Sequence, residues 1–268
     1  KNLYSLYKKA YTPWKWYKRL NEECRKKKLI FFPSVFDKSS VDYALKNKSQ
    51  IVKIASPEIN DIDLLEYISK KNFHNIMLST GLGNEKEISE AIKILRKKNS
   101  NLVLMKCNSA YPTTLEEMNL VMIKEFQKKF KLDIGLSDHS TNTIAPAVAV
   151  SLGAKVIEKH FCISKNSIDG FFSLNPKEFK NMVVQVRDVE KSLGKKSYEI
   201  SKNSKPNLFA KRSLYVVQDV KKNEVFTSKN VKSIRPSFGL NTRYLKKIIG
   251  KKSKVNIKAG NRMKLNYF

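Results

Sequence analysis

The chain is poor in the residues from which disulfide frameworks and thiolate metal sites are made. It has three cysteines, Cys24, Cys107 and Cys162, and no two of them have the Cys-x-x-Cys spacing. An odd number of widely separated cysteines argues against a disulfide scaffold and against a zinc site, and it fits the reducing cytoplasm. We expect Cys107 and Cys162 to be small buried side chains rather than nucleophiles, because the sequence shows no base beside either.

Long apolar runs are also missing. No stretch approaches the ~20 apolar residues that a membrane-spanning helix needs. Charged and aromatic residues interrupt the N-terminal stretch KNLYSLYKKAYTPWKWYKRL, so it lacks the apolar centre of a signal peptide. Hydrophobic residues nevertheless make up 41% of the chain, which is enough for a large core. The composition therefore predicts a globular protein with no membrane partner.

Acidic residues are scarce relative to basic ones. The chain has 24 acidic and 53 basic residues, 45 of them lysine, and its formal net charge is +29. Such a charge fits a nucleic-acid-binding protein, whose affinity would fall steeply with salt. However, the lysines are scattered as pairs, without clustered arginine, zinc-finger spacing or an aromatic RNA-binding pattern. We therefore favour a lysine bias of composition, which also attracts an anionic small substrate, and expect no nucleic-acid partner.

Apolar, strand-like segments alternate with helix-like segments in the first part of the chain. The strand-like segments are 29–36, 51–56, 75–80, 102–107, 133–137 and 155–161, and the clearest helical ones are 84–98, 115–130 and 143–153. Apolar strands that alternate with helices predict a parallel sheet with both faces covered. The fold class is therefore α/β with the rhythm of a (β/α)8 TIM-type barrel, although only six of the eight units are found.

The pattern changes near the C-terminus. We expect a partial barrel domain over 1–192, a polar and helix-poor linker over 193–208, and a small β-rich domain over 209–268. The last of these reads as short strands and turns, with one helical piece near 241–249.

Polar residues gather at the C-terminal ends of the six predicted strands. They are Ser34; Lys53 and Ser56; Ser79 and Thr80; Lys106, Asn108 and Ser109; Ser137, Asp138 and His139; Glu158, Lys159 and His160. The carboxyl ends of the strands of a parallel barrel carry its catalytic groups. Polar caps at strand ends are the alternative for any single residue, but six strands in a row favour a site.

Lys53 interrupts an apolar strand, where a charge is costly unless it meets an anion. With Ser56, with Lys106 on another strand, and with TGLG (80–83) allowing close backbone approach, it suggests a cradle for phosphate or carboxylate. His139 and His160 follow successive strands and could converge on a divalent cation with open positions, as in catalytic metal sites. Two satisfied core histidines remain the alternative. His74 precedes a strand and is expected at the surface, at the opposite end of the barrel.

Six short motifs occur in the order KIASPE, LSTG, KCNSAYPTTLEEMNL, GLSDHS, GAKVIEKHF and FSLNPKEF. Together they resemble the sialic acid synthase family, whose enzymes condense phosphoenolpyruvate with an amino sugar. The C-terminal stretch from KRSLYVVQDV to LKKIIGKK is similar to the small antifreeze-like (SAF) domain of that family. The resemblance covers almost the whole chain. YKKAYTPWKWYKRL, SAYP and FSL are most like the pseudaminic acid synthase branch.

The resemblance implies roles for individual residues. The positions that match the catalytic ligands of a divalent metal, Mn²⁺ or Mg²⁺, are His139 and His160. The positions that match the phosphoenolpyruvate site are Ser34, Lys53, Ser56, Ser109 and Ser137. The positions that match residues near the acceptor, an N-acetylated amino sugar, are Tyr111 and Asp169. Arg235 matches an arginine of the small domain that reaches the sugar in the partner subunit, which implies a domain-swapped homodimer.

The implied reaction is an aldol-like condensation that releases phosphate and forms a nine-carbon nonulosonic acid. Pseudaminic acid is the expected product, and N-acetylneuraminate and legionaminate are the alternatives. The family's barrel begins with two further βα units, which carry a catalytic glutamate and a phosphoenolpyruvate-binding lysine. These units are expected to be missing here, and no residue replaces that glutamate. The chain is therefore expected to be part of a longer protein or an inactive, truncated paralogue.

Overall fold

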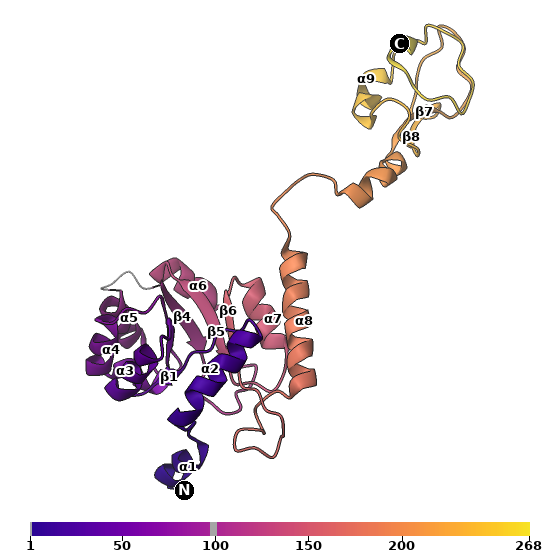
Figure 1. Cartoon of the computed structure of the whole chain (residues 1–268). Helices are drawn as coiled ribbons and strands as arrows, with labels where there is room; N and C mark the ends of the chain where they lie inside the picture. Colours follow the sequence, from indigo (N-terminus) through magenta and orange to yellow (C-terminus); the bar gives the residue numbers. More distant parts are fainter. Residues whose placement is uncertain (1, 97–100) are drawn as a thin grey trace. The chain divides into compact units, whose positions relative to one another are not determined.

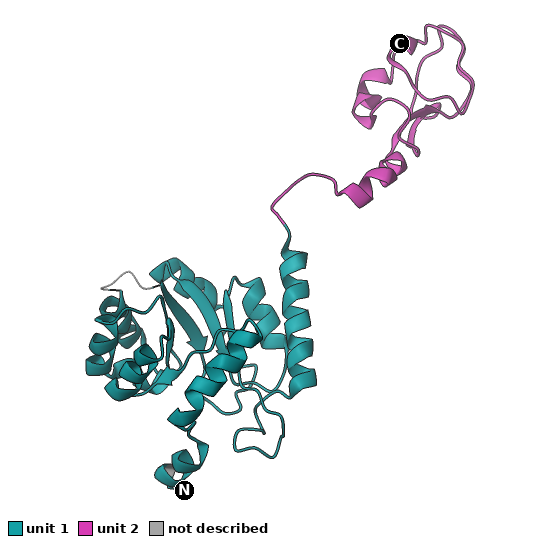
Figure 2. Cartoon of the chain, viewed as in Figure 1, with its two compact units in different colours: residues 1–194 teal, residues 195–268 magenta. Residues whose placement is uncertain are grey.

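The computed structural model describes residues 2–96 and 101–268 and shows two compact units, 1–194 and 195–268 (Figures 1 and 2). The break follows Gly194, just inside the predicted linker over 193–208. Much of that linker is occupied by a 3-10 helix, η3 (Lys202–Ala210), although it was expected to be helix-poor. The Ser201 side chain accepts a hydrogen bond from the Ser204 amide at 3.2 Å, so a local serine cap starts this helix.

The first unit contains a parallel sheet of six strands in sequence order. The strands are β1 (Ser34–Val35), β2 (Ile51–Ile54), β3 (Asn75–Ser79), β4 (Asn101–Cys107), β5 (Asp133–Asp138) and β6 (Val156–Lys159). All six predicted strands are therefore present. β1 is much shorter than the predicted 29–36, because it pairs only with β2 and is preceded by Pro33, which has no amide hydrogen to donate.

Helices connect the strands and cover the sheet (Figure 1). The α-helices of this unit are α1 (Leu3–Ala10), α2 (Tyr17–Lys26), α3 (Lys38–Lys46), α4 (Ile62–Ser69), α5 (Glu85–Leu95), α6 (Met122–Phe130), α7 (Ile144–Ser151) and α8 (Pro176–Leu193); the 3-10 helices are η1 (Trp14–Trp16) and η2 (Ser56–Asn60). The predicted helix over 115–130 begins only at Met122, because Asn119 has a left-handed φ of 45°. The predicted helix over 84–98 is α5, and its residues 97 and 98 lie outside the described part. None of the described helices is long and apolar enough to cross a membrane.

Side chains on the strands alternate between two environments. Those that point toward the helices form the apolar core, which includes Val52, Ile54, Ile76, Leu78, Leu102, Leu104, Ile134 and Leu136. The second face carries Val103 and Gly135 and also polar or sulfur-containing residues, which include Lys53, Met105, Cys107, Ser137 and Glu158, several of them in register on neighbouring strands. The second face of the sheet therefore offers polar groups that can bind a ligand, whereas the first face packs against the helices.

The sheet is strongly curled. Lys53 on β2 and Glu158 on β6 form an ion pair, with Nζ and Oε2 3.3 Å apart. Four strand spacings separate β2 from β6, which is about 19 Å in a flat sheet. Side chains on the second face can meet only if the sheet curves around them, as in a barrel, so polar groups from strands as far apart as β2 and β6 meet there.

The second unit is small and has its own core. It contains an antiparallel pair, β7 (Ser213–Val216) and β8 (Val231–Ile234), and short helices η4 (Thr242–Tyr244), α9 (Leu245–Ile248) and η5 (Leu265–Tyr267). Its buried side chains are Leu214, Val216, Val220, Phe226, Val231, Ile248, Ile257 and Met263. The predicted helical piece near 241–249 is present as η4 and α9, whereas η5 was not predicted.

Candidate active site

Two imidazoles lie together just beyond the ends of β5 and β6. The ring centroids of His139 and His160 are 5.4 Å apart. Nδ1 of His139 is 2.7 Å from the carbonyl oxygen of Asn108, and Nδ1 of His160 is 3.2 Å from Oδ2 of Asp169. A carbonyl or carboxylate at Nδ1 fixes the tautomer with its proton on that atom. Nε2 is then the ring nitrogen left to bind a metal.

Aromatic rings surround this pair. The ring of Tyr111 lies 4.1 Å from that of His139 and 6.0 Å from that of His160, and the ring of Phe172 lies 4.7 Å from that of His160. Tyr111 is 48% exposed, yet burial of its hydroxyl raises its pKa to about 12. It is therefore a neutral hydrogen-bonding group that faces both solvent and the histidines.

Three hydroxyl groups, from Ser56, Ser109 and Ser137, gather around the sulfur of Cys107. Ser56 Oγ accepts a hydrogen bond from the Gly81 amide at 3.0 Å and lies 3.5 Å from the sulfur of Cys107. The same sulfur is 3.9 Å from Ser109 Oγ, and Ser137 is paired in register with Cys107. A Cβ on Gly81 would collide with Ser109 and come within 3.0 Å of Ser56 Oγ. The glycine therefore makes room for this cluster, in keeping with the close backbone approach expected of TGLG.

Cys107 is buried, as predicted, but the expectation that no base lies beside it is wrong. Burial raises the pKa of its thiol, but hydrogen bonds with His139 and Ser56 outweigh that effect and bring the pKa down to about 7. Burial also opposes the charging of His139, and contact with Cys107 and the Asn108 carbonyl raises its pKa overall. This contact cannot be predicted from sequence spacing, because Cys107 ends β4 and His139 follows the neighbouring strand β5.

Lys53 supplies the positive charge of the site. Its side chain is almost fully buried and pairs with Glu158, whose charge also acts on His139 and His160. Burial lowers the pKa of His160, and Asp169 offsets this only in part. His160 is therefore neutral at physiological pH, the form that can bind a metal.

Two residues named from the sequence, Ser34 and Lys106, lie apart from this cluster, and a third, Arg235, belongs to the other unit. Ser34 is paired in register with Lys53 but is exposed at the edge strand. Arg235 belongs to the second unit, directly after β8, and is exposed. Lys106 points to the helix side, donates a hydrogen bond to the Cys107 carbonyl at 2.8 Å and lines a separate groove, so the structure separates it from Lys53. Adjacent residues of a strand face opposite sides of the sheet, so the expectation that Lys106 joins Lys53 in one cradle is wrong. His74 is exposed before β3, as predicted.

The sequence reasoning gave no role to several other polar groups. Among the described residues, Ser79 Oγ and Glu58 Oε2 are buried without a hydrogen-bond partner, and Glu158 Oε2 has the ion-pair contact with Lys53. Burial raises the pKa of Glu58, although Lys53 acts in the opposite direction. An available signal was the period of two along β3, which puts Ser79 on the same face as Met77, the residue in register with Lys53.

The donor set fits a divalent cation with open positions. Within residues 2–96 and 101–268, no group of three or more His, Cys, Asp or Glu side chains could hold a metal by itself. Two oriented imidazoles leave the remaining positions to water and substrate, which is the arrangement of catalytic rather than structural metals.

Comparison with known proteins identifies the protein family. Residues 1–198 match the NeuB family, and residues 211–261 match the SAF domain. The chain belongs to the NeuB family. It is 40% identical to the pseudaminic acid synthase of Campylobacter jejuni subsp. jejuni serotype O:23/36 (strain 81-176), in an alignment that covers 100% of this chain and 79% of that protein. The predicted resemblance to sialic acid synthases is thereby confirmed.

Other family members extend this comparison. An N,N'-diacetyllegionaminic acid synthase of Campylobacter jejuni is 36% identical, over 90% of this chain and 74% of that protein. The crystal structure of the N-acetylneuraminic acid synthetase of Leptospira borgpetersenii superimposes with a TM-score of 0.70 at 32% identity, over 75% of this chain and 71% of that one. The family thus includes relatives named for three different products.

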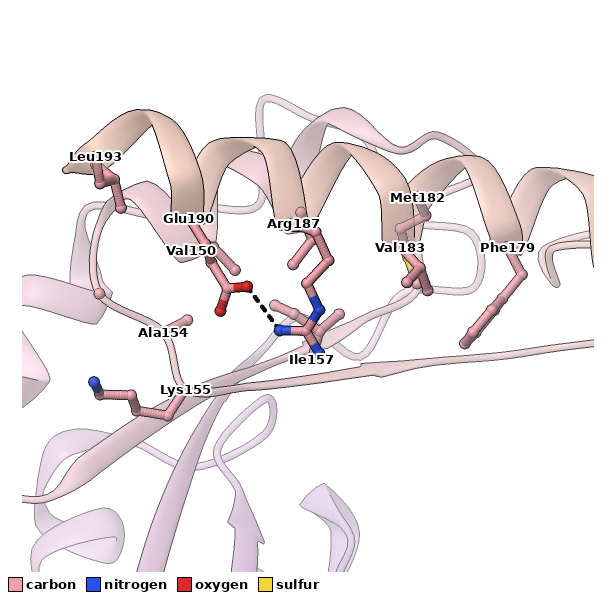
Figure 3. Close-up of a pocket in the computed structure, with 12 residues that line it drawn as sticks. Val150, Ala154, Lys155, Ile157, Phe179, Met182, Val183, Arg187, Glu190 and Leu193 are labelled. Atoms are coloured by element: carbon pink, nitrogen blue, oxygen red, sulfur yellow. Dashed lines mark hydrogen bonds and ion pairs between the residues drawn. The ribbon is translucent and has the colours of Figure 1, made fainter. Parts of the chain in front are cut away.

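A cavity of about 420 Å³ lies at the end of β6 opposite to His160 (Figure 3). Side chains of α8 point into it toward Lys155, which precedes β6, and Arg187 and Glu190 form an ion pair of 2.7 Å there. Most of the other lining residues are apolar, including Val150, Ile157 and Met182. The cavity holds none of the groups that converge at the histidines.

Proposed function

We propose that the protein condenses phosphoenolpyruvate with an N-acetylated amino sugar, releases phosphate and forms a nine-carbon 2-keto acid of the pseudaminic acid type. The observation that carries this proposal is the 40% identity to a pseudaminic acid synthase over the whole chain. The acceptor would be a diacetamido-trideoxy altrose in its open-chain form.

The anion cradle would hold phosphoenolpyruvate. Lys53 supplies the charge, and the hydroxyls of Ser56, Ser109 and Ser137 supply hydrogen bonds to phosphate and carboxylate oxygens. Ser79 Oγ, which is buried without a partner, can donate to the same ligand. Ser34 would approach from the edge strand. Fixing both anionic groups orients the enol carbon toward the histidines.

His139 and His160 would hold the divalent metal, Mn²⁺ or Mg²⁺. Bound there, the cation would polarise the sugar aldehyde as a Lewis acid. The Asn108 carbonyl and the Asp169 carboxylate each contact an Nδ1 atom, which would leave the Nε2 atoms of both rings for the cation. Tyr111, with its neutral hydroxyl, and Asp169 would orient the sugar beside them.

The chemistry has two steps. C3 of phosphoenolpyruvate attacks the aldehyde carbon, the new C–C bond forms, and the aldehyde oxygen takes up a proton. Water then adds at C2, and the C–O bond to phosphate breaks, so that phosphate leaves with its bridging oxygen and a keto group remains. Glu58 is the carboxyl best suited to hold a proton near Lys53, because burial raises its pKa.

The proposal extends to assembly and compartment. Arg235 would reach the sugar site of a second copy, so the active form would be a domain-swapped homodimer. Its exposure after β8 leaves the guanidinium available for this contact. All three cysteines are free, which suits a cytoplasmic enzyme. Legionaminate synthesis is the second candidate function, because a legionaminic acid synthase is 36% identical over 90% of the chain.

Phosphate release from phosphoenolpyruvate in the presence of Mn²⁺ tests the function. The diacetamido-altrose, its legionaminate-type isomer and N-acetylmannosamine would be offered side by side. Both the 268-residue chain and a form extended upstream by two βα units would be assayed. We expect release that depends on the altrose derivative and stops on chelation. Preference for the isomer would support the legionaminate alternative, and no release in either form would contradict the proposal.

Two histidine variants form a matched pair for this assay. His139→Ala should lose at least ~100-fold in turnover, because it removes one of two metal ligands. His74→Ala should keep full turnover, because His74 is exposed at the other end of β3. Equal activity of the two variants would contradict the metal site.

A further inference from the structure

A buried ion pair lies directly behind the two histidines. Asp138 and Lys159 are the last residues of β5 and β6, and they are paired in register. Lys159 Nζ is 2.7 Å from Asp138 Oδ2, and the two side chains are 1% and 0% exposed. Each is the residue immediately before a histidine of the site, although alternation points it to the opposite face of the sheet.

The pair belongs to a closed hydrogen-bond network. Asp138 Oδ1 accepts a hydrogen bond from the Ser140 amide at 2.8 Å. Lys159 Nζ donates to the Ser140 carbonyl and lies 3.3 Å from its hydroxyl. His139 stands between Asp138 and Ser140, so the network fixes the backbone on both sides of it and ties that segment to the residue before His160.

Stability does not explain such a pair. Removing two charges from water costs about as much as their attraction returns, and apolar residues of similar volume often do as well. What an ion pair adds is direction, because its hydrogen bonds hold at one geometry only. Here the constrained distance is the one between the two strand ends that carry the metal-binding rings.

We infer that Asp138 and Lys159 are positioning residues: their ion pair sets the spacing of His139 and His160 and thereby the affinity for the divalent cation. The inference rests on the metal site of the proposed function. The ion pair touches neither the cation nor the substrate. It acts through the backbone of the two histidines, in the way that outer partners tune metal ligands.

The test is Mn²⁺ affinity, measured by the electron paramagnetic resonance of free Mn²⁺, beside a thermal melt. The variant is Asp138→Leu with Lys159→Met, which removes both charges and leaves no unpaired one. We expect a melting temperature equal to or above that of the unmodified protein, with Mn²⁺ bound about 10- to 100-fold more weakly. A purely structural role would change the melt and leave the affinity of the folded protein intact.

The second unit offers a matched control. Asp219 and Lys258 also form an ion pair of 2.7 Å, but both side chains are exposed. Asp219→Leu with Lys258→Met makes the same chemical change, and we expect unaltered Mn²⁺ affinity. His139→Ala serves as the variant without a site.

The possible outcomes distinguish a failure of this inference from a failure of the proposed metal site. If the unmodified protein binds no Mn²⁺, the metal site and the inference are both overturned. If the unmodified protein binds and the folded Asp138→Leu, Lys159→Met variant binds equally well, the inference alone is overturned. Should that variant fail to fold, Asp138→Asn with Lys159→Gln applies the same criterion, because it removes both charges of the ion pair and keeps polar side chains of similar size: a several-fold weaker affinity supports the inference, and an unchanged one overturns it.

Discussion

Gly81 shows, at the scale of a single residue, how closely the anion cradle is packed. A Cβ at this position would lie 2.9 Å from Cys107 Sγ and 3.0 Å from Ser56 Oγ and would displace Ser109. We therefore predict that Gly81→Ala costs about 1–3 kcal/mol of stability through overpacking and raises the KM for phosphoenolpyruvate by at least ~10-fold, about 1.4 kcal/mol of binding. Thermal melts and steady-state kinetics measure the two effects.

Gly83→Ala is the control for this prediction. Its Cβ would press on Ile59 and Ile88, which belong to the apolar core and not to the cradle. It should lower the melting temperature while leaving the KM for phosphoenolpyruvate unchanged. If the two variants altered the KM equally, the cradle would not depend on the space at Gly81.

Individual residues were predictable where an apolar context made them conspicuous. Lys53 stood out because a charge inside an apolar strand needs a partner, and the structure supplies Glu158. His139 and His160 stood out because the chain has only three histidines. The partners of Cys107 were not predictable, because they depend on contacts across strands, whereas the face of Ser79 was predictable from the alternation of side chains along β3. Lys106 was assigned to the wrong face of the sheet, because side chains alternate between the two faces along β4.

At the scale of elements, α8 depends on its first turn. Asn175 Oδ1 accepts a hydrogen bond from the Glu178 amide at 2.9 Å, and Glu178 Oε2 accepts one from the Asn175 amide at 2.8 Å. Losing such a cap typically costs about 1 kcal/mol. We predict that Asn175→Ala destabilises the first unit by about this amount. Asn181→Ala, an exposed change within the same helix, should be neutral or slightly stabilising, because alanine has the higher helix propensity.

A denaturant titration followed by circular dichroism distinguishes these variants. Equal midpoints for Asn175→Ala and Asn181→Ala would show that the capping box contributes nothing to α8. Lys165 also contacts the capping box, because its Nζ donates a hydrogen bond to Glu178 Oε2 at 2.9 Å. Since Lys165 and Asp169 share the loop that follows β6, the same cap also ties the start of α8 to the segment that supports His160.

The existence of elements was easier to predict than their ends. All six strands were found from their apolar runs, because burial of the sheet requires them. The starts of β1 and α6 were placed too early, because Pro33 and the left-handed Asn119 act locally against the apolar pattern. η3 was missed because a serine cap, rather than hydrophobic periodicity, starts it.

At the scale of the whole molecule, the chain consists of two units with separate cores. The first core includes Leu64, Leu104 and Ile134, and the second includes Leu214 and Phe226. The two motif sets found in the sequence coincide with this division, because each set belongs to a domain that buries its own apolar surface. The role predicted for Arg235, contact with the sugar site of a second copy, requires a second unit that is folded around its own core.

The segment between the units should be the first to be cut by a protease. Residues 195–200 are exposed and lie between α8 and η3, and they contain Lys195 and Lys196. Proteases cut where the backbone is exposed and free of regular structure. We predict that dilute trypsin first yields two fragments that meet at these lysines, identifiable by mass spectrometry, and that both persist because each keeps its core. Lys195→Gln with Lys196→Gln should slow this first cut about 10-fold or more, since the remaining basic sites lie mostly within folded units. Early fragments that begin inside 213–263 would instead show that the second unit does not hold together without the first.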